Sequence, residues 1–140
     1  MTQKKALIVF LLFVFIGYTV GCGKKPETKE ERYPDGKLKI RYTYNAAGLL
    51  DGVVTRYYPN GKLQNEATYK NNLLEGIMKG YYESGTLKDE VNWKDDKPEG
   101  ISKGYYENGK LRTEVNYKDG VMMWRRCYDE QKNTIQCPGK

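Results

Sequence analysis

A seven-residue pattern that recurs every 24 residues is the strongest constraint on the fold of this chain of 140 residues. Its three clear copies, YYPNGKL, YYESGTL and YYENGKL, begin at Tyr57, Tyr81 and Tyr105. A more divergent copy, YPDGKLKIRYTY, begins at Tyr33. A period in the range of about 20 to 50 residues indicates one supersecondary unit that stacks on copies of itself. The sequence therefore predicts a repeat architecture.

Within each copy the residues after the glycine alternate between two classes. In the copy that begins at Tyr81, one set comprises Leu87, Asp89, Val91 and Trp93, and the other comprises Lys88, Glu90 and Asn92. A period of two residues is typical of a half-buried β-strand, whose side chains point alternately to opposite faces. The first set is therefore expected on an apolar face and the second on a polar face.

A glycine preceded by Asn, Ser or Asp separates the two extended runs of each unit. The pairs are Asn60-Gly61, Ser84-Gly85, Asn108-Gly109 and, in the first copy, Asp35-Gly36. Such pairs favour hairpin turns because glycine adopts positive φ without strain. With a three-residue loop, Tyr81 lies opposite Leu87, and Tyr82 lies on the other face. We predict an all-β fold, an elongated single-layer antiparallel meander of about nine strands built from repeated hairpins and preceded by a signal peptide.

The first 21 residues have the character of a secretory signal. Lys4 and Lys5 precede an apolar run over residues 6–20, which is followed by Gly21-Cys22. The tetrapeptide TVGC resembles a bacterial lipobox, although Thr19 stands where Leu is usual. The resemblance implies a lipid on Cys22 and anchoring to a membrane of the cell envelope. An ordinary signal peptide, in which Cys22 has no role, and an uncleaved anchor remain the alternatives.

The segment after the signal is charged. Residues 22–32 contain GKKPETKEER and no large apolar side chain, so we expect a tether before a repeat domain at residues 33–140. Gly23 is not the acidic residue that often marks inner-membrane retention, which favours the outer membrane or the cell surface. Without residues 1–21 the net charge falls from +6 to +4, with 22 basic and 18 acidic side chains. This dispersed excess and the predicted export argue against a nucleic-acid partner.

The two remaining cysteines, Cys127 and Cys137, lie near the end of the chain. If Gln131-Lys132-Asn133 forms the last hairpin loop, the two cysteines are directly opposed at disulfide distance. A disulfide suits the oxidising compartment to which a signal peptide leads. The chain has no His, so no metal site is expected, and no cofactor other than the lipid on Cys22.

Groups suited to catalysis are scarce. Beyond residue 21 the only serines are Ser84 and Ser102, and without His the usual acyl-transfer triads are excluded. A row of carboxylates remains, formed by Glu66, Glu90 and Glu114. Such a row could act as the carboxylate pair of a glycosidase or form solvated ion pairs with Lys62, Lys88 and Arg112; the flat setting favours ion pairs. We predict a protein without enzymatic activity.

A second row consists of tyrosines without apparent apolar cover, namely Tyr58, Tyr82, Tyr106 and Tyr128. These side chains could stabilise the sheet by cross-strand packing. They could equally form a strip that binds a partner, because tyrosine offers a large contact area at small entropic cost. They are the candidate partner-binding residues.

The recurring pattern YYxNGxL, with Glu, Tyr and Gly at fixed offsets, resembles the variant MORN repeat over about residues 33–137. The resemblance includes proteins labelled as YwqK-like antitoxin components. It implies an elongated sheet of hairpins that serves as a scaffold for protein or membrane contacts, and the label implies restraint of a toxic partner. This chain departs from the pattern at Arg41, which replaces the repeated Glu, and at Gln131-Lys132-Asn133, which replaces Asn-Gly.

These observations favour a membrane-anchored lipoprotein whose sheet binds another protein at the cell envelope and resembles an antitoxin or immunity protein. A lipid-tethered exported protein could not neutralise a toxin in the cytosol. The alternative is a structural module, or one that binds glycan or lipid surfaces, and an envelope hydrolase is a third possibility. A single-layer sheet cannot cover its own apolar face, so a homodimer is also possible.

Overall fold

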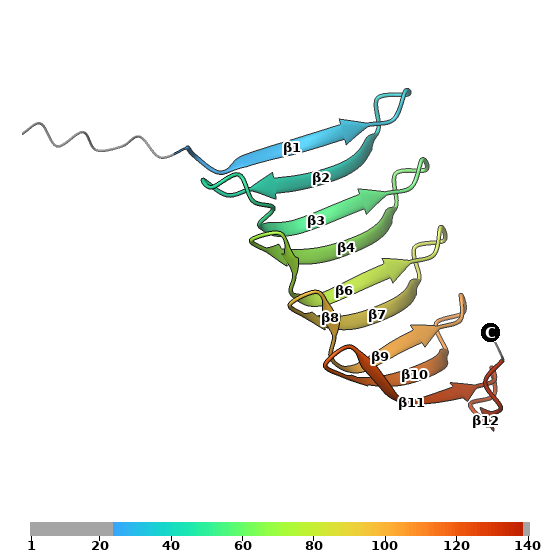
Figure 1. Ribbon diagram of the computed structural model, residues 1–140. Coiled ribbons are helices and arrows are strands. Elements are labelled where there is room, and N and C mark those ends of the chain that lie inside the picture. Colours follow the sequence, from blue (N-terminus) through green and yellow to red (C-terminus); the bar gives the residue numbers. More distant parts are fainter. Residues whose placement is uncertain (1–23, 139–140) are drawn as a thin grey trace, which may run out of the picture.

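The computed structural model describes residues 24–138, which form one open antiparallel sheet (Figure 1). No helix is present in this range, and the predicted single-layer meander of hairpins is confirmed. The strands are β1 (Glu27–Arg32), β2 (Leu38–Tyr44), β3 (Gly52–Tyr57), β4 (Leu63–Lys70), β5 (Leu73–Leu74), β6 (Gly76–Tyr81), β7 (Leu87–Lys94), β8 (Lys97–Pro98), β9 (Gly100–Tyr105), β10 (Leu111–Lys118), β11 (Val121–Tyr128) and β12 (Thr134–Ile135).

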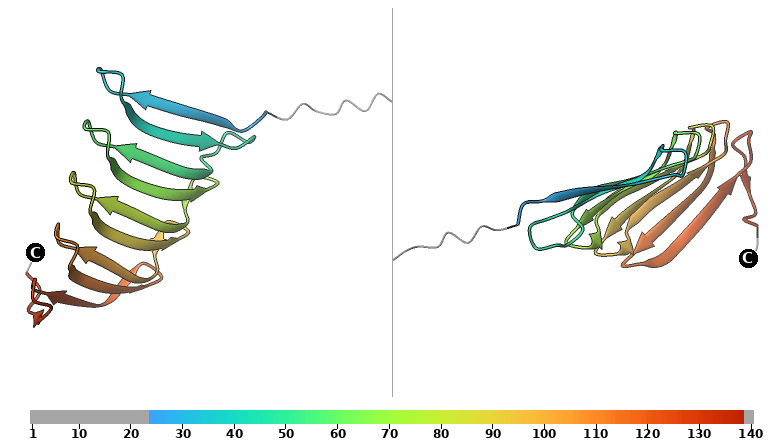
Figure 2. Two further views of the ribbon diagram at one scale, coloured as in Figure 1. Left: turned by 180° about the vertical axis from the view of Figure 1, so that it is seen from behind. Right: turned by 90° about the horizontal axis from the view of Figure 1, so that it is seen from above.

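The strands follow one another across the sheet in chain order. The two-residue strands β5 and β8 lie off this path and pair only with β4 and β7. Successive hairpins are offset and twisted relative to one another, so the sheet winds like a staircase from β1 to β12 (Figure 2). Compared with the expected nine strands, the sheet also contains β1, β5 and β8. Every long strand contacts only its neighbours, as in other repeat proteins.

One edge of the staircase is made of wide hairpin turns with a common geometry. In the turn after β6, the N–H of Gly85 donates to the carbonyl of Tyr82, and the N–H of Tyr82 donates to the carbonyl of Thr86. Gly85 has a φ of 96°, which explains the glycine of the repeat. In the last turn Lys132 takes this position with a φ of 69°. The predicted three-residue loop is therefore confirmed in the repeats.

The opposite edge has two-residue turns in three places. Both central residues have positive φ in Asn71-Asn72, in Asp95-Asp96 and in Asp119-Gly120. Positive φ at both positions defines the type I′ turn, whose twist matches that of the flanking strands. Asn, Asp and Gly are the residues that tolerate this conformation best. The repeat is thus encoded at both edges by its turn residues.

A β-bulge after each wide turn changes the expected assignment of faces. Tyr81 lies opposite Leu87, as predicted, but Gly80 lies opposite Asp89, so Lys88 is an extra residue in β7. Because the bulge reverses the alternation, Leu87 does not share a face with Asp89 and Val91. The same register shift follows Tyr57 and Tyr105. The prediction that places Leu87 and Val91 on one face is therefore wrong.

The bulges leave two faces of different character. The side that carries Ile40, Val54, Ala67 and Cys127, which are the buried hydrophobic residues of residues 24–138, is named the apolar face. The side that carries Glu66, Lys79, Glu90, Lys103 and Glu114 is named the charged face. No described side chain is completely buried, since one layer cannot enclose a core.

The charged segment predicted as a tether is partly a strand. Residues 27–32 form β1, which pairs with β2 from Glu27 opposite Tyr44 to Arg32 opposite Leu38. All six residues are exposed, so apolar burial does not hold this strand. Backbone hydrogen bonds and ion pairs such as Arg41–Glu30, at 2.8 Å, hold it instead. The repeat domain therefore begins before residue 33.

Candidate functional site

The second tyrosine of each pair links its repeat to the next one. The hydroxyls of Tyr58, Tyr82 and Tyr106 donate to the carbonyls of Tyr81, Tyr105 and Tyr128 at 2.8, 2.7 and 2.8 Å. Tyr33 makes the same bond to the carbonyl of Tyr57 at 2.7 Å. These rings are half-buried, and their polar ends are occupied within the sheet. The geometry supports the stabilising alternative for this row, whereas its role in partner binding remains a proposal.

Tyr128 does not belong to that row, contrary to the prediction. Its hydroxyl donates to Glu114 at 2.7 Å, just as Tyr81 donates to Glu66 and Tyr105 donates to Glu90, both at 2.9 Å. Tyr128 is thus the counterpart of the first tyrosine of the pair. Asp129 takes the place of the second, because its N–H closes the last turn on the carbonyl of Asn133. The last unit follows after 23 rather than 24 residues, which obscured this alignment.

Burial and carboxylate contacts shift the titration of these tyrosines. Burial and the hydrogen bond to Glu66 raise the pKa of Tyr81 to about 12, and burial with Glu90 raises the pKa of Tyr105 to about 12. The hydrogen bond to Glu114 raises the pKa of Tyr128. Ionising any of these tyrosines would place two negative charges together, so all three remain neutral donors at neutral pH.

A row of alternating charges crosses the middle of the charged face. Neighbouring strands contribute Glu66, Lys79, Glu90, Lys103, Glu114 and Arg126, each directly opposite the next. The prediction named Lys62, Lys88 and Arg112 as the partners, but none of them lies in this row. Lys88 and Arg112 are the extra residues of two bulges. Lys62 lies in a wide turn and donates to the carbonyl of Ser84 at 2.7 Å. A basic residue thus separates the carboxylates, so neighbouring strands do not form the carboxylate pair of a glycosidase. The row stabilises pairing between strands.

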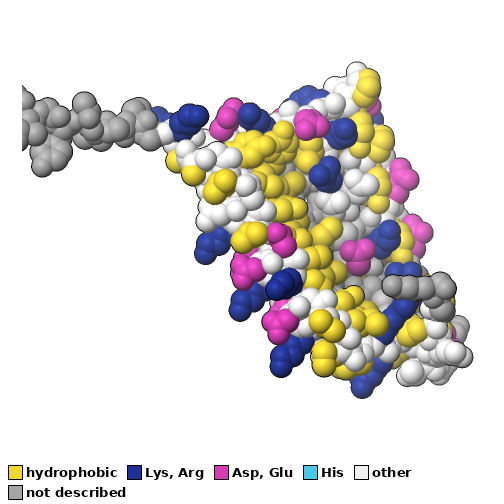
Figure 3. All heavy atoms as spheres, viewed as in Figure 1, with side chains coloured by type: hydrophobic (Ala, Val, Ile, Leu, Met, Phe, Trp, Pro, Cys, Tyr) yellow, Lys and Arg dark blue, Asp and Glu magenta, His cyan; other side chains and the backbone are white. Residues whose placement is uncertain are grey.

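The apolar face carries a continuous hydrophobic band across the strands (Figure 3). Near its first end, a hollow of about 250 Å³ is bordered by Tyr42, Tyr44, Leu50, Tyr69, Ile40, Val54, Glu31 and Arg56. Tyr42 and Tyr44 meet edge to face, with ring centroids 5.6 Å apart. The sequence did not single out these aromatic residues. The signal that could have identified them is their alternate positions within β2, which place both rings on one face of the sheet.

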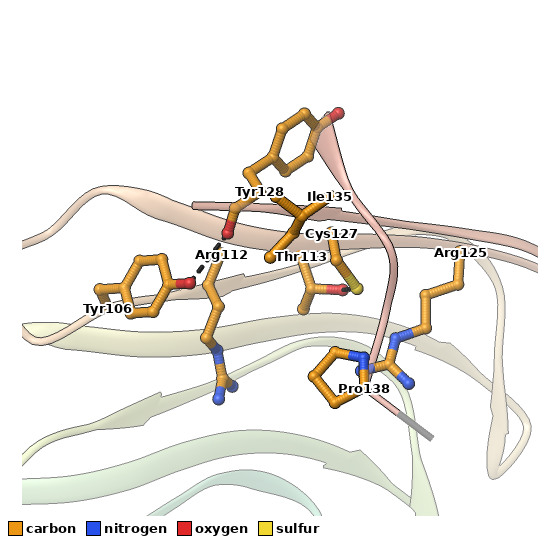
Figure 4. A pocket seen from close by; sticks show the side chains of 8 residues that line it. All are labelled: Tyr106, Arg112, Thr113, Arg125, Cys127, Tyr128, Ile135 and Pro138. Atoms are coloured by element: carbon orange, nitrogen blue, oxygen red, sulfur yellow. Dashed lines mark hydrogen bonds between the residues drawn. The ribbon is translucent and has the colours of Figure 1, made fainter. Parts of the chain in front are cut away.

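A second hollow of about 290 Å³ lies at the last strands (Figure 4). It is bordered by Tyr106, Arg112, Thr113, Arg125, Cys127, Tyr128, Ile135 and Pro138. Arg112 comes from β10 and Arg125 from β11, on two sides of the hollow. Neither guanidinium forms an ion pair with a carboxylate side chain of residues 24–138. Sequence reasoning did not single out Arg125, because an extra residue in β11, Met123, interrupts the alternation of faces just before it.

A disulfide between Cys127 and Cys137 closes this end of the sheet, as predicted. The Cα atoms are 5.2 Å apart. The expected register is wrong, however, because Cys127 lies opposite Ile135 and Tyr128 lies opposite Thr134. The bond therefore joins β11 to a residue just beyond β12. The wide turn of the repeat, with Glu130-Gln131-Lys132 as its loop, explains the shift.

Two features of the described residues concern ligands and membranes. Residues 24–138 hold no cluster of His, Cys, Asp and Glu suited to a metal ion. The same part of the chain has no helix long and apolar enough to cross a membrane. The predicted signal peptide and lipidation site, residues 1–21 and Cys22, lie outside the described residues.

Comparison with known families agrees with this geometry. A model of the MORN repeat variant matches four segments, residues 28–46, 50–71, 74–95 and 98–119. Each segment covers two long paired strands and the turn between them, and together the segments span more than half of the chain. No curated protein matches the chain. MORN repeats form a module used in protein binding and membrane association. The chain belongs to the MORN repeat variant family.

Proposed function

We propose that this chain is a non-enzymatic protein-binding module of the bacterial cell envelope, anchored to a membrane by a lipid on Cys22. The single observation that supports the proposal most is the hydrophobic band on the apolar face (Figure 3). In residues 24–138 no second layer covers this band. Monomeric soluble proteins rarely expose large continuous apolar patches unless a partner covers them. Restraint of a toxic envelope protein, as the antitoxin label implies, is one form of such binding.

The hollow at the first end of the apolar face adds support for a partner. Tyr42, Tyr44 and Tyr69 border it together with the charged side chains of Glu31 and Arg56. The apolar face therefore offers both hydrophobic and charged contacts. A protein surface supplies both kinds of contact.

Site-specific cross-linking in cells tests this proposal. A photoreactive residue replaces Tyr44 on the apolar face of the full-length protein, and in a matched control it replaces Thr43 on the charged face. We expect Tyr44 to give a cross-linked adduct with a discrete protein and Thr43 to give none. Absence of protein adducts from both positions, together with binding to purified peptidoglycan or anionic vesicles, would instead support the glycan- or lipid-binding alternative.

The anchor is tested independently of the partner. We expect Cys22→Ala to release the protein from membranes or to block its processing, as followed by fractionation and mass spectrometry. A Cys22→Ala protein that is fully processed and still membrane-bound would contradict lipid anchoring. The protein would then reach the envelope by another route, and the binding proposal would stand unaffected.

A further inference from the structure

The outer edge of β11 is open along most of its length. Cys127 and Tyr128 pair with β12, whereas Val121–Arg126 pair only with β10 on the inner side. Within residues 24–138 no other strand approaches this edge. The unpaired N–H and C=O groups of an edge strand are a template for one more strand. Addition of an extended peptide to such an edge is a common mode of protein recognition.

The first half of this open edge is apolar, which is unusual for an unprotected strand. Val121, Met122 and Met123 are 63%, 55% and 57% exposed. Natural edge strands commonly carry charges that discourage pairing, and β1 at the other end does so with five charged residues in six. The segment Val121–Met123 carries none. Exposed methionines also adapt readily to the shape of a bound chain.

The hollow beside this edge supplies charge complementarity. Arg112 and Arg125 border it together with apolar side chains, and Figure 4 shows the two arginines on separate sides of it. Arg126 has a different role on the charged face, where its guanidinium stacks 4.6 Å from the centre of the Trp124 ring. Arg112 and Arg125 are thus positioned to receive a carboxylate, to which guanidinium groups bind strongly.

We propose that the outer edge of β11 binds an extended segment of the partner protein as an added strand. Apolar residues of that segment lie beside Val121–Met123, and an acidic side chain enters the hollow between Arg112 and Arg125. The proposal rests on the protein-binding function above and specifies where the partner attaches. A second copy of this chain fits less well, because β11 has no carboxylate to offer to Arg125.

A peptide-binding experiment tests this site on the full-length protein in detergent. The probe is a fluorescent octapeptide with two glutamates at its amino end followed by alternating valine and threonine. One control peptide has lysines in place of the glutamates, and another has methylated backbone nitrogens at alternate residues. We expect the probe to bind and both controls to bind at least about tenfold more weakly, because each control loses one kind of contact.

Variants assign the binding to this end of the sheet. Arg112→Ala with Arg125→Ala should weaken probe binding about tenfold or more, whereas Lys29→Ala with Lys39→Ala at the first end should leave it unchanged. Hydrogen exchange adds a readout of strand pairing, since the amides of Val121–Arg126 should become protected when the probe binds. The amides of β1 should not.

Several outcomes would overturn the proposal. These are absence of probe binding, equal binding of the lysine or methylated peptide, and full binding by the arginine variant. Dimerisation that protects β11 amides without peptide would identify a second copy as the occupant instead. The cross-linking experiment at Tyr44 is independent of these results. A protein adduct at Tyr44 would still support the protein-binding function, and the partner would then attach at a site other than the edge of β11.

Discussion

The first and last long strands, β1 and β11, have equivalent places at the two ends of one sheet but are held in different ways. β1 is wholly exposed and charged, and Glu30 contacts both Arg32 and Arg41. β11 exposes apolar residues, and a disulfide from Cys127 fixes its final turn. Because each strand contacts only its neighbours, the two ends should respond independently to change. One end relies on exchangeable ion pairs and the other on a covalent bond.

Loss of the disulfide should have the largest effect. Cys127→Ser with Cys137→Ser removes a link between residues 10 apart, and we expect the free energy of unfolding to fall by about 2–3 kcal/mol. Chemical denaturation measures this loss. Hydrogen exchange should accelerate in β11 and β12 and remain unchanged in β1 and β2. Equal acceleration at both ends would show that the ends are coupled, which would contradict the comparison.

Equivalent positions on the apolar face hold Gly104 in the second half of the sheet and Arg56 in the first half. A Cβ on Gly104 would lie 2.8 Å from Thr113 Cγ2, whereas the equivalent place, just before Tyr57, is occupied by the exposed side chain of Arg56. We expect Gly104→Ala to lower the free energy of unfolding by about 1–3 kcal/mol through overpacking. The matched Arg56→Ala should change it by less than about 0.5 kcal/mol. Equal effects in thermal or chemical denaturation would contradict this reading.

The sequence predicts the repeat well because turn chemistry is local. The glycines at positive φ and the Asn, Asp and Gly residues of the tight turns specify the hairpins without reference to distant residues. The pairing of Tyr81 with Leu87 follows from the loop length. The disulfide follows from two cysteines placed about one hairpin apart. Each of these predictions depends only on residues that lie close together in the sequence.

The bulge at Lys88 and its counterparts is what the sequence does not reveal. Strict alternation of side-chain type continues through the bulge, so the pattern predicts one face where the backbone changes to the other. The face of Val91 depends on the extra residue Lys88, and the face of Arg125 depends on a separate extra residue in β11, Met123. The strand character of β1 is equally hidden, since a charged run forms a strand only because β2 offers an edge. The residues that border the two hollows could therefore be identified only from the structure.

The tyrosine–carboxylate pairs give a prediction that depends on pH. Ionised tyrosine is disfavoured in the folded state at Tyr81 and Tyr105, whose pKa values are about 12 against 10 for an ordinary tyrosine. Their stabilising contribution is complete below pH 10 and is lost as the pH rises from 10 to 12. Tyr81→Phe with Tyr105→Phe should therefore flatten the fall in unfolding free energy over this range. A slope identical to that of the wild type would exclude these two tyrosines as its source.

At neutral pH, single substitutions of tyrosine by phenylalanine compare a repeat that has this hydrogen bond with one that lacks it. Tyr105→Phe removes the donor to Glu90, and we expect a loss of about 1 kcal/mol because the carboxylate keeps fewer partners. In the first repeat, Arg41 stands where a carboxylate would accept the bond from Tyr57, and the Tyr57 hydroxyl makes no hydrogen bond to residues 24–138. Tyr57→Phe should thus leave the stability unchanged. A loss equal to that of Tyr105→Phe would show that the hydrogen bond to Glu90 is not the source of the loss.

The smallest effect is expected at the ion pairs of β1. Arg41 donates to Glu30 at 2.9 Å, and this hydrogen bond is the main cause that lowers the pKa of Glu30 below its usual value of 4.5. Exposed pairs of this kind contribute little and are screened by salt. A lowered carboxyl pKa stabilises the fold above the unfolded value and loses that contribution as the pH falls through the folded value. Arg41→Ala should therefore destabilise slightly at pH 7 in low salt, progressively less as the pH falls below 4.5, and not measurably in high salt. A large loss that persists in high salt would mean that Arg41 acts through packing, and β1 would then resemble β11 more closely than its charges indicate.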